Sequence, residues 1–190
     1  MAAFALVSPA ADFVPAETAL GHSSDSSLVK VRVASFAPGV AAVLGTEGGA
    51  RLVRVTDGAI LTNIAVSTLR AAVTNGRLFV QGLPVAATNV IVQSVDGIVA
   101  VNGIRYRGDF LLCFSEGRLG VVNRIDVEEY LRGVLPHEVD PKWHPEALKT
   151  QAIAARSYVL SRASENSRFS HDVDNSTSSQ VYRGMSGEKA

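Results

Sequence analysis

The sequence contains a single cysteine, Cys113, so the chain cannot form an internal disulfide. Cys113 stands in the apolar run from Phe110 to Phe114, and this context predicts a small buried hydrophobic residue. The lack of disulfides does not identify the redox compartment, because proteins of oxidising compartments also fold without them.

Several other features are missing. Lysine plus arginine and aspartate plus glutamate both number 18, so the net charge is zero and nucleic acid is not an expected partner. No apolar run approaches the roughly 18 residues that span a bilayer, so no transmembrane span is expected. The chain also has no glycine-rich phosphate loop, and no cofactor is expected.

The composition that remains is typical of a folded protein, with 47% hydrophobic and 19% charged residues among 190. Residues 1–27 are rich in Ala, Pro, Ser and Thr without helical or strand periodicity, which indicates a flexible lead-in. Its apolar start resembles the remnant of an export signal, although the basic residues that usually precede such a signal are missing.

Residues 28–105 are predicted to form a β-rich region. Short apolar runs are separated by Asp57-Gly58, Asn75-Gly76, Asp96-Gly97 and Asn102-Gly103, dipeptides that favour tight hairpin turns. We expect residues 98–101 to pair with 104–106, and residues 110–114 to pair with 119–122. No residue of these strands has the pattern of a catalytic group.

The pattern becomes helical after Asn123. Asp126 is a candidate N-cap, and the helix it opens is expected to end near Gly133. Pro136 and Pro141 are predicted to exclude helix between them, which would place Glu138 in a constrained loop. A second helix is expected from Pro145 to about residue 164, with a core stripe of Leu148, Ala152, Ala155 and Val159. The fold class predicted from these patterns is α+β.

Three groups of residues carry a specific resemblance. They are Tyr130-Leu-Arg-Gly-Val-Leu-Pro-His-Glu-Val with Trp143, the helix Glu146-Ala-Leu-Lys-Thr-Gln-Ala-Ile-Ala-Ala-Arg-Ser-Tyr158, and Gln180-Val-Tyr-Arg-Gly184. In this order they resemble the catalytic core of the SpoIID/LytB family. The resemblance implies that residues 106–190 form that core, incomplete at its C-terminus because similar proteins continue beyond the last motif.

The resemblance implies an exported cell-envelope protein that acts on peptidoglycan glycan strands. Glu138 matches the family's catalytic glutamate and is expected to act alone as a lytic transglycosylase acid and base. It would protonate the departing glycosidic oxygen and then deprotonate the sugar's C6 hydroxyl, giving a 1,6-anhydro product. An ordinary glycosidase needs a second carboxylate. Asp140 is the nearest candidate, but a local turn role is favoured for it.

Further roles follow from position. As an acid Glu138 must be protonated, which requires burial to raise its pKa, and neighbouring Val139, Pro136, Pro141 and Trp143 could form the apolar wall. Core filling is preferred over sugar stacking for Trp143. The expected substrate-binding residues are Gln151, Arg156, Gln180 and Tyr182. Gln151 and Arg156 could equally be ordinary solvated side chains. Gln180 and Tyr182 could equally form structural hydrogen bonds.

The family resemblance also leaves a second function open. LytB-like members are noncatalytic glycan-binding or amidase-enhancing proteins, so a cell-wall amidase is the alternative partner. Some members place Cys and His before the Gln-Val-Tyr motif, whereas this chain has Asp174, Asn175, Ser178 and Ser179 there. No metal site is therefore expected.

Overall fold

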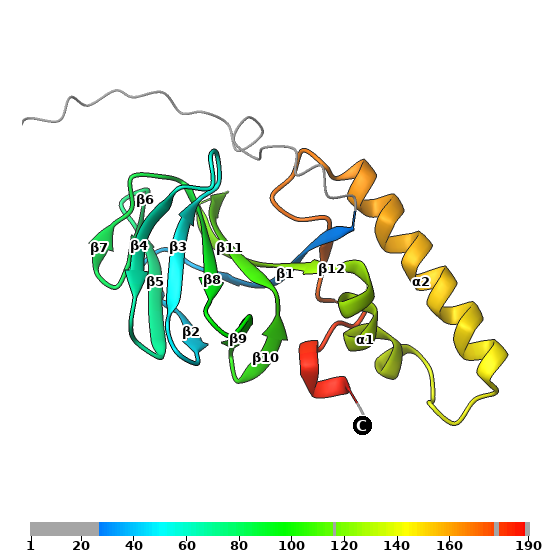
Figure 1. Cartoon of the computed structure of the whole chain (residues 1–190). Helices are drawn as coiled ribbons and strands as arrows, with labels where there is room; N and C mark the ends of the chain where they lie inside the picture. Colours follow the sequence, from blue (N-terminus) through cyan, green and yellow to red (C-terminus); the bar gives the residue numbers. More distant parts are fainter. Residues whose placement is uncertain (1–26, 116, 177–178, 189–190) are drawn as a thin grey trace, which may run out of the picture.

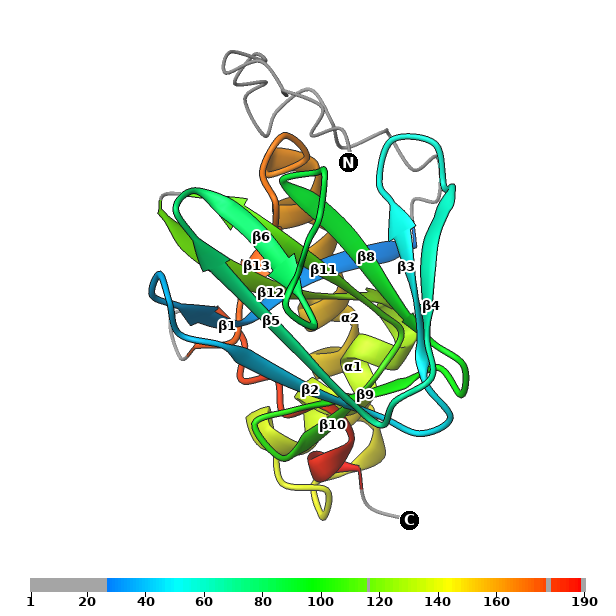
Figure 2. The same cartoon turned by 90° about the vertical axis from the view of Figure 1, so that its left-hand side faces the viewer.

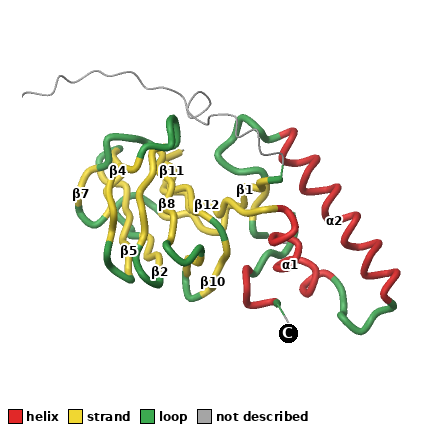
Figure 3. The backbone as a smooth tube through the Cα atoms, viewed as in Figure 1, coloured by secondary structure: helices red, strands yellow, loops and turns green. Residues whose placement is uncertain are grey.

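The computed structural model describes residues 27–115, 117–176 and 179–188. The predicted export-signal remnant and nearly all of the predicted lead-in therefore lie outside the described residues. Two β-sheets and two helices make up most of the described chain, in agreement with the predicted α+β class. Strands and helices occupy separate parts of the molecule, with most of the strands on one side and α1 and α2 on the other (Figure 3).

The elements follow one another as β1 Leu28–Phe36, β2 Ala42–Thr46, β3 Ala50–Arg54, β4 Ile60–Ile64, β5 Thr68–Thr74, β6 Arg77–Val80, β7 Leu83–Pro84, β8 Asn89–Ser94, β9 Ile98–Val101, β10 Ile104–Arg107, β11 Asp109–Ser115, β12 Arg118–Asp126, α1 Val127–Glu138, α2 Pro145–Glu165, β13 Val173–Asp174 and the 3-10 helix η2 Gly184–Gly187. The larger sheet has the order β13-β1-β12-β11-β8-β3-β4, and the smaller has the order β10-β9-β2-β5-β6-β7. The smaller sheet lies in front of the larger in Figure 2, and the helices lie beyond the strands.

Local turn chemistry explains the hairpins. Asn75 and Asn102 have positive φ angles of 51°, and each precedes a glycine that also has positive φ. Two successive residues with positive φ match the right-handed twist of the paired strands. The expected pairings of β9 with β10 and of β11 with β12 are both confirmed.

Strands from both predicted regions share the sheets. β1 pairs antiparallel with β12 over its whole length, and β8 pairs with β11. The side chains between the two sheets form the main core, which extends to one face of α1 through Tyr130, Leu131 and Val134. Strands from either side of residue 105 are therefore hydrogen-bonded to one another in the same sheet. The boundary between two regions at this residue stays a prediction.

Helix α1 is longer than the sequence predicted. Asp126 is its N-cap as expected and accepts a hydrogen bond from the backbone N–H of Glu128 at 2.8 Å. The expected stop at Gly133 and the expected loop at Glu138 are wrong, because α1 continues through Pro136 to Glu138. Pro136 removes one backbone hydrogen bond, and its ring crowds the carbonyl four residues before it. Packing of the preceding turns on the core offsets that loss.

Helix α2 starts and ends close to its predicted bounds, with Pro145 in its first turn. Its predicted core stripe is confirmed at Ala155 and Val159, whereas Leu148 and Ala152 are only half-buried. In Figure 1, α2 runs along the outside of the molecule, and its first turns project beyond α1. The chain then returns beside β1, where β13 pairs parallel with it.

Candidate active site

Glu138 is presented at the C-terminal end of α1. Its side chain is exposed, and Oε1 accepts a hydrogen bond from the backbone N–H of Val181 at 3.0 Å. The helix ends directly after it, as Val139 adopts an extended backbone with its N–H donating to the Leu135 carbonyl at 3.1 Å. The carboxylate therefore has a defined position on a regular element.

The segment from Gln180 to Gly184 lies along α1 and contacts it at several levels. The hydroxyl of Tyr130 donates to Gln180 Oε1 at 3.1 Å, and the backbone N–H of Arg183 donates to the Gly133 carbonyl at 3.2 Å. With the Glu138 contact, these bonds join residues of two motifs that lie 43 to 50 positions apart in the sequence. Figure 1 shows the red C-terminal segment beside α1.

Tyr182 is the centre of this contact. Its side chain is buried, and its ring lies 4.9 Å from the Tyr130 ring and 5.6 Å from the Tyr106 ring, centroid to centroid. Its hydroxyl donates to Asn123 Oδ1 on β12 at 2.8 Å, and its backbone N–H donates to Asn175 Oδ1 at 3.1 Å. Burial raises the pKa of Tyr182 far above its usual value, so the hydroxyl stays a proton donor.

Gly133 explains why the segment can approach α1 so closely. A β-carbon on Gly133 would lie 2.6 Å from Cε2 of Tyr182 and 2.8 Å from the Gly184 carbonyl oxygen. Both distances are far below van der Waals contact. The glycine that the sequence suggested as a helix stop is instead the place where a ring packs on the helix backbone.

Tyr130 links the buried cluster to the exposed acid. Burial raises the pKa of the Tyr130 hydroxyl, with the charges of Tyr158 and then Glu138 adding to the rise. Tyr130 is itself fully buried. The Tyr130 phenol thus stays neutral and donates its hydrogen bond to Gln180.

The structure places the four predicted substrate-binding residues in two groups. Gln180 and Tyr182 are buried and hydrogen-bonded to protein, a placement that favours their supporting role over direct glycan contact. Arg156 makes a bidentate ion pair with Glu128, with both N–O distances at 2.7 Å. Glu128 precedes Glu138 by ten positions, about 15 Å along a helix, so this pair does not reach Glu138. Gln151 is half-buried on α2.

Of the four residues expected to form an apolar wall, Pro136 and Val139 are half-buried, and Pro141 and Trp143 are exposed. The side chain of Trp143 is 55% exposed, which overturns the prediction that it fills the core. Asp140 has the predicted turn role, since its Oδ1 accepts the Lys142 backbone N–H at 2.9 Å. His144 caps α2 through Nδ1, which accepts the Glu146 backbone N–H.

Within the described ranges, no three His, Cys, Asp or Glu side chains gather in a way that could hold a metal ion. Nor is any helix of the described chain long and apolar enough to cross a membrane.

Sequence reasoning missed two supporting residues, Asn123 and Asn175. Asn123 is fully buried within β12, where its amide also donates to the Arg107 carbonyl at 2.8 Å. A polar residue inside the apolar run of β12 was the available signal, because a buried amide needs partners. Asn175 carried no comparable signal.

Comparison with known proteins gives one family match and several similar relatives. The family described as SpoIID, Stage II sporulation protein, matches residues 115–190. An uncharacterized protein of Brachyspira hyodysenteriae is 42% identical over 96 residues, which cover 50% of this chain and 26% of that protein. Stage II sporulation protein D of Bacillus subtilis is 38% identical over 66 residues, 33% of this chain and 19% of the relative.

The same-named protein of Bacillus amyloliquefaciens is 39% identical over 69 residues, covering 34% of this chain and 20% of the relative. The matched segments thus span between a fifth and about a quarter of the length of these relatives. No solved structure shows significant similarity to the chain.

Proposed function

We propose, from the similarity of residues 115–190 to the SpoIID family, that the protein acts in the bacterial cell wall as a peptidoglycan lytic transglycosylase. Its substrate is a glycan strand without stem peptides, and it works outside the cytoplasmic membrane. The observation that carries the proposal is the contact of the Glu138 carboxylate with the Gln-Val-Tyr segment.

The geometry around Glu138 supports a two-step proton transfer. Val181 occupies Oε1 with its N–H, so Oε2 is the oxygen that carries the proton of the acid form. Oε2 gives this proton to the glycosidic oxygen as the bond from C1 to that oxygen breaks. The C6 hydroxyl of the same sugar then bonds to C1 and returns its proton to the carboxylate, so no water is consumed.

The exposure of Glu138 fits a polymeric substrate. A glycan strand is long and polar, and it can reach a carboxylate at a helix end without entering a closed cavity. Tyr182, Gln180 and Tyr130 act as positioning residues in this proposal, because they hold the Val181 amide beside α1 through buried contacts.

Mass analysis of the products of peptide-free glycan tests the proposal. The wild type is expected to release fragments with 1,6-anhydromuramic ends. Glu138→Gln removes the proton donor while keeping an acceptor for Val181, and the rate is expected to fall by at least about 100-fold. Glu165→Gln, at the far end of α2, is the matched control and is expected to retain full activity.

The fold of each variant is checked by its thermal unfolding midpoint. A folded Glu138→Gln protein that still cleaves glycan at the wild-type rate would contradict the catalytic role of Glu138.

A second candidate, the noncatalytic amidase-enhancing role, is favoured by a different observation. Trp143, Ile153 and Leu160 are large apolar side chains exposed along and before α2. Exposed apolar residues that gather on one element are typical of protein contacts. Under this alternative, Ile153→Asp would abolish stimulation of a cell-wall amidase, whereas Glu138→Gln would leave it unchanged and no anhydro ends would form.

A further inference from the structure

A cavity of about 560 Å³ lies on the outer face of the larger sheet. Side chains alternate between the faces of a strand, and Leu112 and Val121 pack into the main core. Their neighbours Cys113 and Gly120 therefore face outward and form the floor of the cavity. The walls include Arg32, Ser35 and Arg118 from the sheet and Arg168, Ser170 and His171 from the loop after α2.

This cavity is remote from Glu138 along the chain's elements. Arg118 starts β12 and Asp126 ends it, eight positions later, which corresponds to about 26 Å of extended strand. Glu138 then lies a further 12 residues along, at the end of α1. The cavity is thus a separate feature of the fold, and its volume falls within the range of small-molecule sites, about 300–1,000 Å³.

The lining carries an excess of positive charge. Arg32 pairs with Asp174 through two hydrogen bonds of 2.7 and 3.0 Å, so this pair is neutral. Within the described part of the chain, no carboxylate lies at ion-pair distance from Arg118 or Arg168. Burial raises the pKa of the Cys113 thiol, so the floor adds no negative charge. Among the described residues, the guanidinium groups of Arg118 and Arg168 thus have no carboxylate partner.

The guanidinium groups of Arg32 and Arg118 are held in place by hydrogen bonds, and each has further N–H groups that can donate to a ligand. Arg118 donates from Nε to Ser35 Oγ at 2.9 Å and from Nη2 to the Ser35 carbonyl at 3.3 Å. Arginine has five N–H donors, so three on Arg118 and three on Arg32 lie outside these bonds. Pre-positioned donors bind an anion with little further loss of side-chain freedom.

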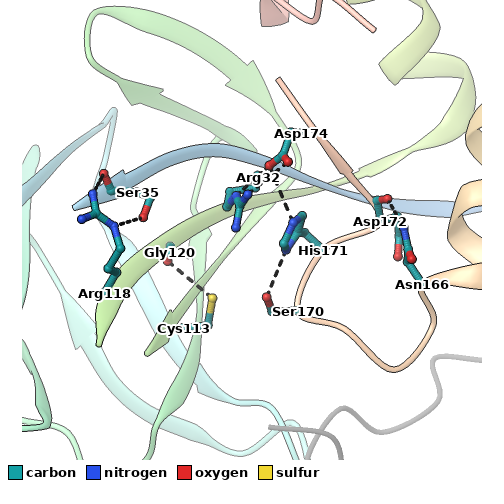
Figure 4. A network of polar contacts seen from close by, with 10 residues as sticks. All are labelled: Arg32, Ser35, Cys113, Arg118, Gly120, Asn166, Ser170, His171, Asp172 and Asp174. Atoms are coloured by element: carbon teal, nitrogen blue, oxygen red, sulfur yellow. Dashed lines mark hydrogen bonds and ion pairs between the residues drawn. The ribbon is translucent and has the colours of Figure 1, made fainter. Parts of the chain in front are cut away.

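The opposite wall is anchored as well. Asn166 donates to the Asp172 carbonyl at 2.7 Å, and Asp172 accepts the backbone N–H of Lys30 at 2.8 Å. Ser170 Oγ lies 3.2 Å from His171 Nδ1, and His171 Nε2 lies 3.6 Å from Asp174 Oδ1. Figure 4 shows Arg32, Arg118, Cys113, Ser170 and His171 arranged around the same space.

We propose that this cavity, between the outer face of β1, β12 and β11 and the loop after α2, binds a phosphate monoester carried on a sugar-sized polar ligand. The guanidinium fork matches phosphate oxygens, and serine hydroxyls on both walls supply further donors. A phosphate monoester carries a charge of about −1.5 to −2 at neutral pH, close to the excess of two positive charges. A carboxylate would neutralise only half of it.

Calorimetric titration of the full 190-residue chain with glucose 6-phosphate tests the proposal. We expect saturable binding in near-physiological salt, no binding of glucose, and at least about tenfold weaker binding of glucuronic acid, which carries one negative charge. Arg118→Gln and Arg168→Gln are each expected to weaken the phosphate ligand by about tenfold or more. Arg77→Gln, at the exposed first residue of β6, is the matched control and should bind normally.

Three results would overturn the proposal: no saturable binding of glucose 6-phosphate, equal binding of glucuronic acid, or an equal loss in the Arg77→Gln control. Glu138→Gln is expected to bind the ligand as the wild type does. Failure here leaves the proposed glycan cleavage untouched, because Glu138 does not line the cavity and no residue that lines it is changed in the cleavage test.

Discussion

Helices α1 and α2 differ in how far the rest of the protein covers them. Five of the 12 residues of α1 are buried, against two of the 21 residues of α2. α1 packs on the sheet core and on the Gln-Val-Tyr segment along its length. α2 contacts the body mainly through Ala155 and Val159 in its second half.

The comparison shows where the precision of the candidate site comes from. Glu138 is fixed in position because it lies on α1, the helix that the rest of the protein covers, and its hydrogen bond to Val181 adds a second restraint. Trp143 and Gln151 belong to the loop and helix with little cover. The acid thus lies on the covered helix, whereas two of the residues expected around it lie on parts of the chain with little cover.

Removing the Tyr182 ring should have the largest effect on stability, because this ring is part of what covers α1. Tyr182→Ala deletes a fully buried aromatic side chain from the α1 contact and should lower the free energy of unfolding by about 3–5 kcal/mol. Ile153→Ala, on the exposed surface of α2, should change it by no more than about 0.5 kcal/mol. Urea unfolding of both variants measures the values, and equal losses would refute the stated contrast.

Adding one carbon at Gly133 should have the next largest effect. Alanine normally favours a helix over glycine, but here its β-carbon would overlap the Tyr182 ring. We expect Gly133→Ala to destabilise the protein by about 1–3 kcal/mol. Ser157→Ala, on the exposed face of α2, should instead be neutral or slightly stabilising. A more stable Gly133→Ala protein would show that the segment does not pack there.

The contact of Asp172 with Lys30, in the loop after α2, should make the stability of the protein depend on pH. Burial raises the pKa of Asp172 above its usual value, and the Lys30 ammonium only partly opposes this. The folded state thus binds a proton more readily than the unfolded state. This contribution to stability is present below pH 3.8, the ordinary value, and is lost as pH rises through the raised pKa.

Asp172→Asn removes this titration while keeping an oxygen to accept the Lys30 N–H. The unfolding midpoint of the variant, followed from pH 3 to 7, should therefore fall less with rising pH than that of the wild type. Identical pH profiles would contradict the assignment of this effect to Asp172.

Arg156→Gln should have the smallest effect. The Arg156–Glu128 pair is largely exposed, and exposed pairs contribute little to stability. Because the pair lies about 15 Å along α1 from Glu138, glycan cleavage should also be unchanged. A selective rise in KM would instead restore Arg156 as a glycan-binding residue, the role first expected from its place in the family motif.

The elements that the sequence predicted correctly depend on local chemistry. The Asn102-Gly103 hairpin, the Asp126 cap and the Pro145 helix start each follow from a few adjacent residues. The end of α1 was missed because Gly133 and Pro136 resemble stops locally. The local sequence could not show that the helix continues past both residues or that the Tyr182 ring, 49 positions away, packs on Gly133.

The candidate site was predictable in its parts but not in its arrangement. Glu138 and the Gln-Val-Tyr motif were identified from the family resemblance, and their hydrogen bond joins them in space. The sequence could not show that Gln180 and Tyr182 turn inward, because that depends on Asn123 and Tyr130 as partners. It also could not show that Arg156 would meet Glu128 across two helices.

The most direct measurement is the cleavage of peptide-free glycan in water enriched in oxygen-18. If Glu138 directs the sugar's own C6 hydroxyl to C1, the new ends carry no oxygen-18 and their mass is lower by one water than that of hydrolysed ends. Products that contain oxygen-18 at the new ends would contradict the account, because water would then be the nucleophile.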